Sequence, residues 1–279
     1  MTFEAQIQKL FETLRTQEGT FPPHGIMSQK LDKITDGLSK NIVKQDSFDV
    51  QVHPEIVKLF ATASIEMWLR AIHSFLVSTA LINVSPLWVS ISGYYSSHYS
   101  VRAIAHLLGF YQLRSKSFAV SLQSSRAGFI CNYKKGKNRE HSFYWNKIKE
   151  HPFLSNEQLF TINPEDSDIS DAGHRNFATY VDHLNKFPNF SPLAYIELKK
   201  RIEYISKIEI KSYPIPMRTK YPDIDSVQIV AYHRLVYFRE LLDNALGGSN
   251  RFWSVHRNPS WCRDIIDFQR IKPQLIHSI

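Results

Sequence analysis

The chain has 279 residues, 43% of them hydrophobic and 22% charged, which is the composition of a folded protein rather than a disordered one. Its 34 Lys and Arg residues exceed its 26 Asp and Glu residues, and the resulting net charge of +8 suits a polyanionic partner such as nucleic acid. Cys131 and Cys262 are the two cysteines, which excludes a disulfide framework and favours two reduced thiols in a cytoplasmic protein.

Residues 1–50 are predicted to form an N-terminal helical extension. Phe3, Ile7 and Leu14 keep the spacing of an amphipathic helix over residues 3–16. Glycines and prolines then end this helix, and a second helix begins at Ser28. The polar run KQDSFDVQVH follows and leads to Pro54.

Two long helices are expected next, over residues 54–81 and 86–113. The turn between them is short, so the two helices are expected to pack antiparallel. Residues 71–101 contain no Asp, Glu, Lys or Arg and are long enough to span a bilayer. Because Asn83, Pro86 and several serines interrupt this stretch, a buried hairpin is favoured over a membrane-associated one, and no membrane partner is expected.

The second long helix carries a polar ridge. We use this name for the side chains that helical spacing places along one side of the helix: Tyr95, His98, Tyr99, Arg102 and His106. Apolar residues surround the ridge, so its polar groups must find partners within the fold. The ridge is therefore either a fold-specific hydrogen-bond network or part of a site.

Residues 115–190 are predicted to be an irregular, partly β insertion. The segments GFICNY and HSFYW are predicted as the two strands of a hairpin, with KKGKNRE as the turn. That turn is either a solvated loop or a contact to phosphates, and its candidate nucleic-acid ligands are Lys134, Lys135, Lys137 and Arg139. A polar, acidic connection and a short helix through His183 complete the insertion.

Helices are predicted again over residues 193–210 and 224–246, with a proline-rich linker between them. Gly247 and Gly248 end the second of these helices. The predicted fold class is mainly α, an antiparallel helical bundle with a partly β insertion. Its core is assigned to residues 51–114 and 191–279.

Familiar cofactor and metal motifs are missing from the sequence. It has no glycine-rich nucleotide loop, HExxH or GxSxG, and no histidine pair with convincing metal spacing, so no cofactor or metal is expected. A metal-dependent nuclease motif would need Asp223 before the acidic residue of an ExK. Glu197 precedes Asp223 instead and falls in a predicted helix.

Three Arg/His groups remain as candidate sites. They are Arg251 with His256, Arg102 with His106, and Arg175-Asn176 with His183. An arginine can hold the nonbridging oxygens of a phosphate through its fork, and a histidine can move a proton to or from the reacting oxygens. Taken singly, each group is more often structural than functional.

The segment SGYYSSHYSVRA, residues 92–103, resembles the second-helix signature of the HEPN superfamily. That signature is a small residue, two tyrosines, a spacer, an aromatic residue or histidine, and then Arg-Ala. The preceding helix 54–81 is similar to the first core helix of the family. The family's functional motif, an arginine and a histidine a few residues apart near the start of a late helix, is similar to Arg251 and His256. The resemblance covers residues 54–113 and 224–270.

The resemblance implies a dimeric, HEPN-like helical bundle in which the Arg/His motifs of two subunits face a shared cleft. It further implies a metal-independent endoribonuclease that uses the 2′-hydroxyl of RNA, with Arg251 stabilising phosphate charge and His256 acting as general acid or base. A toxin or antiviral defence effector, restrained by an antitoxin or another regulatory protein, is the expected biological role. Trp253 and Arg257 are candidate RNA contacts beside the motif, although such tryptophans are more often core residues.

One residue departs from the family pattern. Phe252 stands where active members often carry a polar residue, whereas Arg175 has Asn176 beside it but a more distant His183. The alternative function is therefore a non-catalytic helical module that binds nucleic acid or another protein.

Overall fold

The structure is a computed structural model that describes residues 25–125, 128–136, 140–155, 157–161, 195–209 and 224–246. The chain divides into two compact units. Unit 1 takes its described residues from Met1–Met67, Val101–Glu150 and Glu240–Ser260. Unit 2 takes its described residues from Trp68–Ser100 and His151–Arg239. Three long helices, α4 (Pro54–Ala80), α5 (Pro86–Leu107) and α10 (Ile224–Leu246), contribute one part to each unit.

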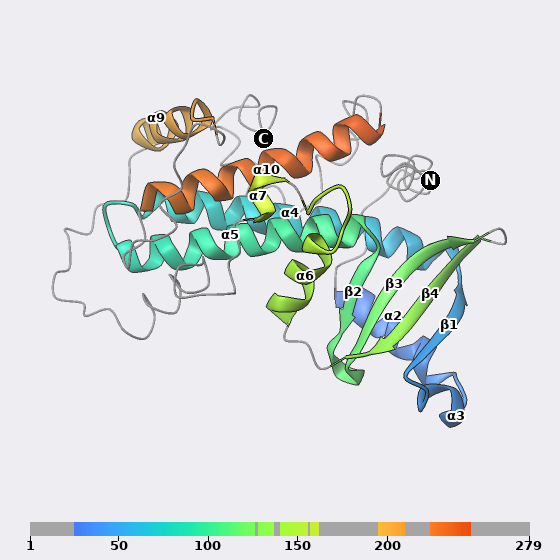
Figure 1. The fold of residues 1–279 in the computed structure, drawn as a ribbon. Coiled ribbons are helices and arrows are strands. Elements are labelled where there is room, and N and C mark those ends of the chain that lie inside the picture. The colour runs from blue at the N-terminus through green and yellow to red at the C-terminus, as the bar shows by residue number, and fades with distance from the viewer. Residues whose placement is uncertain are drawn as a thin grey trace. The chain divides into compact units, whose positions relative to one another are not determined.

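Unit 1 contains a four-stranded antiparallel sheet with the strand order β1-β4-β3-β2 (Figure 1). Its strands are β1 (Ser47–Val52), β2 (Phe110–Leu113), β3 (Phe118–Ser125) and β4 (Gly128–Lys135). The two central strands, β3 and β4, form a hairpin, and β1 joins β4 with Phe48 opposite Tyr133. Because β1 and β4 are far apart in the sequence, this sheet depends on a non-local pairing.

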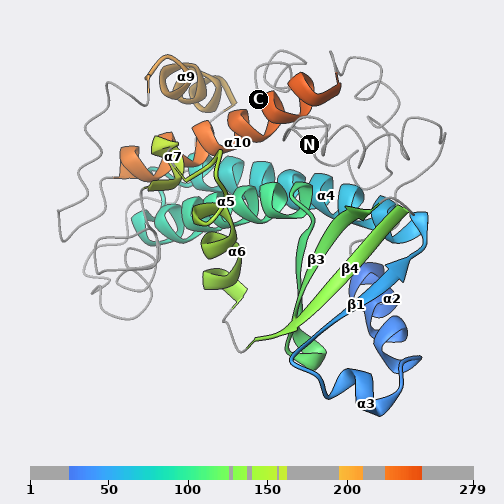
Figure 2. The same ribbon diagram turned by 45° about the vertical axis from the view of Figure 1, so that its right-hand side comes forward.

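One face of the sheet is apolar because successive side chains of a strand point to opposite faces. Phe48 stacks on Tyr133 with ring centroids 5.0 Å apart, and Phe118 meets Tyr133 edge to face at 6.0 Å. Helix α2 (Gly25–Asp36) lies beside the sheet (Figure 2) and contributes buried Met27 and Leu31 to the core of unit 1. Short helices α3 (Lys40–Val43) and α6 (Glu140–Lys149) complete this part of the chain.

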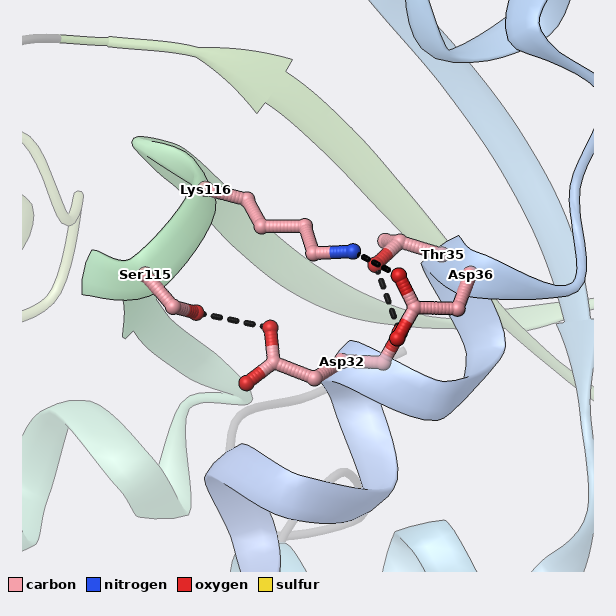
Figure 3. A network of polar contacts seen from close by, with 5 residues as sticks. All are labelled: Asp32, Thr35, Asp36, Ser115 and Lys116. Carbon is pink, nitrogen blue, oxygen red and sulfur yellow. Dashed lines mark hydrogen bonds and ion pairs between the residues drawn. The ribbon is translucent and has the colours of Figure 1, made fainter.

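A set of polar contacts ties α2 to the turn between β2 and β3 (Figure 3). The turn is the 3-10 helix η1 (Arg114–Lys116). Ser115 Oγ donates to Asp32 Oδ1 at 2.6 Å, and Lys116 Nζ forms an ion pair with Asp36. These contacts are exposed, so they orient the turn more than they stabilise the fold.

Unit 2 is built by helices that exchange side-chain-to-backbone hydrogen bonds. Ser96 Oγ donates to Ala71 O at 2.9 Å and Ser78 Oγ donates to Val89 O at 2.9 Å, so α4 and α5 run antiparallel. Trp68 Nε1 donates to Leu235 O at 3.1 Å, which joins α4 to α10. Arginines connect the shorter helices α7 (Gln158–Thr161) and α9 (Tyr195–Ser206) to α10.

The predicted fold class is wrong, because the protein is a mixed α and β structure rather than a helical bundle with an irregular insertion. Strands β1 and β2 fall in segments predicted as a polar run and as the end of a helix. In β1 alternate residues are apolar, which is the pattern of a half-buried strand that the prediction of a polar run overlooked, and β2 follows a helix stop at Gly109, where φ is +81°. The predicted second strand HSFYW is also wrong, since these residues belong to α6.

Several predicted elements are confirmed. The long helices begin at Pro54 and Pro86, and they pack antiparallel as expected. Helix α10 covers residues 224–246 as predicted, and α9 lies within the predicted helix 193–210. Residues 3–16 and the predicted helix through His183 lie outside the described residues. In the described ranges, no helix has the length and apolarity needed to cross a bilayer.

Gly109 forms the junction between α5 and β2, and replacing it by alanine is expected to destabilise the protein. A Cβ atom there would lie 2.9 Å from Leu122 O, and the backbone is in the left-handed region. We expect Gly109→Ala to lower the free energy of unfolding by about 1–3 kcal/mol in chemical denaturation. Gly136→Ala is the control, because a Cβ there meets no atom within 4 Å. Equal stability of the two variants would contradict this role for Gly109.

Candidate functional site

The structure describes four of the predicted site residues, and all four lie in unit 1. Arg102 and His106 lie on α5, and Lys134 and Lys135 end β4. The remaining candidates lie outside the described residues: Arg251, His256, Arg175, Asn176, His183, Lys137, Arg139, Trp253 and Arg257. Of the three predicted Arg/His groups, the Arg102/His106 pair lies within the described residues.

The ridge side chains follow α5 with the expected helical spacing. In unit 2, Tyr95 and Tyr99 stack with ring centroids 5.8 Å apart, and His98 stacks on Tyr94 at 6.1 Å. His98 is buried. These contacts between residues four apart are those that an α-helix brings together. In unit 1 the ridge continues with Arg102 and His106.

Arg102 and His106 are in contact. Arg102 Nε donates to His106 Nε2 over 3.4 Å, a long hydrogen bond, and His106 is fully buried. On the other side of the ring, His106 Nδ1 lies 2.8 Å from the carbonyl oxygen of Phe110. A carbonyl oxygen can only accept, so Nδ1 carries the proton and Nε2 offers its lone pair to the guanidinium. This arrangement holds His106 as a neutral imidazole with both nitrogens engaged.

The hydrogen bond to Phe110 O has a second effect, because β2 is an edge strand of the sheet. Backbone groups of alternate residues point towards and away from the neighbouring strand. Leu122 N donates to Gly109 O at 2.8 Å, so Gly109 and Tyr111 face β3 while Phe110 and Gln112 face outward. Side chains satisfy two of these outward groups. His106 donates to Phe110 O, and Gln112 N donates to Tyr144 Oη at 3.3 Å.

Aromatic rings enclose the imidazole. The ring of His106 stacks on Tyr111 and meets Tyr144 edge to face, with centroids 5.4 Å away in both cases. The guanidinium carbon of Arg102 lies 5.1 Å from the centroid of the Tyr144 ring, within the range of a cation–π contact. Tyr111 Oη is 2.5 Å from Ser28 Oγ, which extends the network to α2.

We call the resulting set of residues the edge network: Ser28, Arg102, His106, Tyr111, Gln112 and Tyr144. It joins α2, α5, α6 and β2 within unit 1. A general acid or base must exchange a proton with substrate, whereas His106 is buried and both its ring nitrogens face protein groups. Of the two roles open to this end of the ridge, the geometry favours a structural network.

Sequence reasoning missed Tyr111 and Tyr144 as partners of the ridge. Tyr144 lies in the segment predicted as a strand, and only its placement on α6 turns the phenol towards Gln112. The signal in the sequence was the run of three aromatic residues, Phe143, Tyr144 and Trp145, and the structure buries all three within α6.

Other reactive groups in the core of unit 1 are unsuited to chemistry. Burial raises the pKa of the Cys131 thiol to about 12, so a thiolate nucleophile does not form at neutral pH. Burial also raises the pKa of Tyr133 well above its usual range, with smaller contributions from Cys131 and Asp32. Within the described ranges, no three His, Cys, Asp or Glu side chains are close enough together to hold a metal ion.

Lys134 and Lys135 are exposed at the end of β4, where the predicted hairpin turn was expected to begin. Lys135 Nζ donates to the carbonyl oxygen of Lys44 at 2.6 Å, which brings the residue after α3 next to this strand end. The two lysines are thus held by the sheet rather than by a free loop.

Comparison of the chain with protein-family models, with curated proteins and with solved structures finds no match.

Replacing His106 should lower the stability of the folded protein. His106→Leu leaves Phe110 O without its imidazole donor and Arg102 Nε without its acceptor, and we expect the free energy of unfolding to fall by about 2–4 kcal/mol. His106→Asn, whose amide can still donate to Phe110 O, should lose less. Urea denaturation measures both. The exposed His73→Ala is the control and should change stability by no more than about 0.5 kcal/mol. If His106→Leu were as mild as the control, the edge network would have no structural importance.

Proposed function

We propose that the protein is a metal-independent endoribonuclease in which Arg251 and His256 form the catalytic pair. The observation that carries the proposal is the position of the segment SGYYSSHYSVRA on α5, directly after α4 and antiparallel to it. This is the order of helices that the resemblance to the HEPN superfamily requires. The late helix α10 ends at Leu246, so Arg251 follows this helix in the sequence by five positions.

The chemistry of this pair needs no metal. The 2′-oxygen attacks the adjacent phosphorus, the bond from phosphorus to the 5′-oxygen breaks, and a 2′,3′-cyclic phosphate and a 5′-hydroxyl result. The proton of the 2′-hydroxyl passes to a base, and an acid returns one to the leaving 5′-oxygen. His256 is suited to such transfers near neutral pH, and Arg251 to stabilising the charge on the nonbridging oxygens.

In this proposal the protein is a homodimer, and the Arg251/His256 pairs of its two subunits share one cleft. Its role is that of a toxin or antiviral defence effector, which a regulatory partner protein restrains. It assigns no chemistry to Arg102 and His106, because the edge network engages both ring nitrogens of His106. Arg175, Asn176 and His183 stay secondary candidates, since His183 is too distant in sequence from Arg175 to match the motif.

A second candidate function is binding of nucleic acid without cleavage. Two observations favour it. Phe252 follows Arg251 where active relatives of the proposed type often have a polar residue, and lysines are exposed at the end of the sheet of unit 1. This candidate predicts salt-dependent RNA binding with no products.

Incubation with labelled RNA in EDTA tests the two candidates. We expect the native protein to produce fragments with cyclic phosphate ends, and His256→Ala to reduce the rate by at least about a hundredfold. His73→Ala, an exposed histidine on α4, is the matched control and should cleave at the native rate.

Intact RNA with the native protein, or undiminished cleavage by His256→Ala, would contradict the nuclease proposal. Intact RNA together with retained RNA binding would support the second candidate. Sedimentation of the native protein tests the proposed dimer. A protein that is monomeric at concentrations at which it cleaves RNA would rule the dimer out.

A further inference from the structure

Four exposed lysines gather at one end of the sheet of unit 1. Lys134 and Lys135 end β4, while Lys40 and Lys44 belong to α3 and its C-cap, just before β1 begins at Ser47. The strand register places Ser47 opposite Lys134, and Lys135 N donates to Asp46 O at 2.9 Å. The start of β1 and the end of β4 therefore meet at the same edge, beside α3 (Figure 2). We call this set of lysines the lysine end of the sheet.

The charges at the lysine end are poorly balanced. In a sheet, a carboxylate directly opposite a lysine would stabilise it. Lys134 instead faces Ser47 on one side and Ala119 on the other, and Lys135 faces Phe118. Nearby acids are engaged elsewhere, since Asp36 pairs with Lys116 and Asp49 accepts from Asn132 Nδ2 at 2.8 Å. Asp46 is the exposed acid left between Lys44 and β1.

Lysines clustered in this way repel each other, and a chain of phosphates relieves the repulsion. Neighbouring β-strands of a sheet lie about 5 Å apart. Lysine side chains from β4 and from the segment leading into β1 can therefore reach consecutive phosphates of one nucleic-acid chain. Each phosphate that a lysine neutralises releases condensed counterions, which favours binding at moderate salt.

We propose that the lysine end binds the phosphate backbone of single-stranded RNA and does so without base specificity. Lysine is a point charge that holds phosphates without reading base edges. In the described part of unit 1, Ile42 is the large apolar side chain that is exposed, and no Trp, Tyr or Phe ring is exposed for base stacking. A single half-exposed isoleucine is also a weak membrane anchor, so RNA is favoured over a lipid surface.

This inference deepens the proposed function, and it rests on that function only for the choice of RNA as the polyanion. It adds Lys40 and Lys44 to the sequence-predicted Lys134 and Lys135, and it needs neither Lys137 nor Arg139.

Fluorescence anisotropy with a 2′-O-methyl RNA of about 12 nucleotides tests the proposal, because this probe lacks the attacking hydroxyl and stays intact. The site variant replaces Lys40, Lys44, Lys134 and Lys135 by Gln. The control variant replaces four lysines outside this set, Lys30, Lys58, Lys200 and Lys207, and has the same net charge as the site variant. We expect the site variant to bind at least about tenfold more weakly and to lose about 3 from the slope of log K against log salt, at about 0.7 per contact.

The control variant should bind as the native protein does. Equal binding by the site variant and the control, or no binding of RNA by the native protein, would overturn the proposal. Binding to vesicles rich in phosphatidylserine without binding to RNA would also overturn it, in favour of a membrane surface. Because the Lys135 side chain bonds Lys44 O, the pair Lys40→Gln and Lys44→Gln, which leaves that donor in place, is measured as well and should weaken binding severalfold.

The outcomes separate this inference from the nuclease proposal. If the native protein binds RNA through the lysine end but cuts none, the binding surface stands and the nuclease proposal fails. If cleavage occurs and the site variant matches the native protein in both KM and kcat, the nuclease proposal stands and the binding surface fails. Both stand if the site variant raises KM severalfold and leaves kcat unchanged, which is the split expected when a contact is lost that holds substrate and transition state equally well.

Discussion

The edge of a β-sheet leaves a row of backbone groups that need partners, and the fold of unit 1 depends on how β2 meets this need. Phe110 and Gln112 turn a carbonyl oxygen and an N–H away from β3. Edge strands are liabilities because another chain can pair with them. Here the buried side chains of His106 from α5 and Tyr144 from α6 replace a neighbouring strand as hydrogen-bond partners. The two hydrogen bonds are partly buried, so a polar group left without a partner there would be costly.

This constraint explains why the ridge of α5 ends in an arginine and a histidine. The imidazole must donate through Nδ1 to Phe110 O, and its other nitrogen then needs a donor, which Arg102 one helical turn earlier provides. The guanidinium in turn lies over the Tyr144 ring. A pattern of residues that suits phosphate chemistry can thus serve packing alone, and the proposed chemistry falls to a different Arg/His pair, Arg251 and His256.

The sequence predicts the long helices well and the sheet poorly, for physical reasons. Helices α4 and α10 are long and repeat their apolar residues with a helical period, so local sequence is enough to find them. Strand β1 is short, half polar and paired with β4 about 80 residues later, and no local pattern reports such a pairing. In HSFYW, aromatic residues with high strand propensity belong to a helix because tertiary burial outweighs propensity. The ridge could be recognised because its residues share one helix, whereas its partners Tyr111 and Tyr144 come from other elements and could not be recognised from spacing. Lys134 and Lys135 were recognisable as a basic run, whereas their neighbours Lys40 and Lys44 emerge only from the strand register.

The central claim is that the Arg102/His106 end of the ridge is a structural network and no catalytic site. Nitrogen-detected NMR of His106 imidazole in the native protein tests it most directly, because the chemical shifts of the two ring nitrogens reveal which one carries the proton. We expect a neutral ring protonated at Nδ1 at neutral pH, and a backbone N–H of Gln112 that is protected from hydrogen exchange. An imidazolium, a ring protonated at Nε2, or rapid hydrogen exchange of the Gln112 backbone N–H would contradict the structural role of this network.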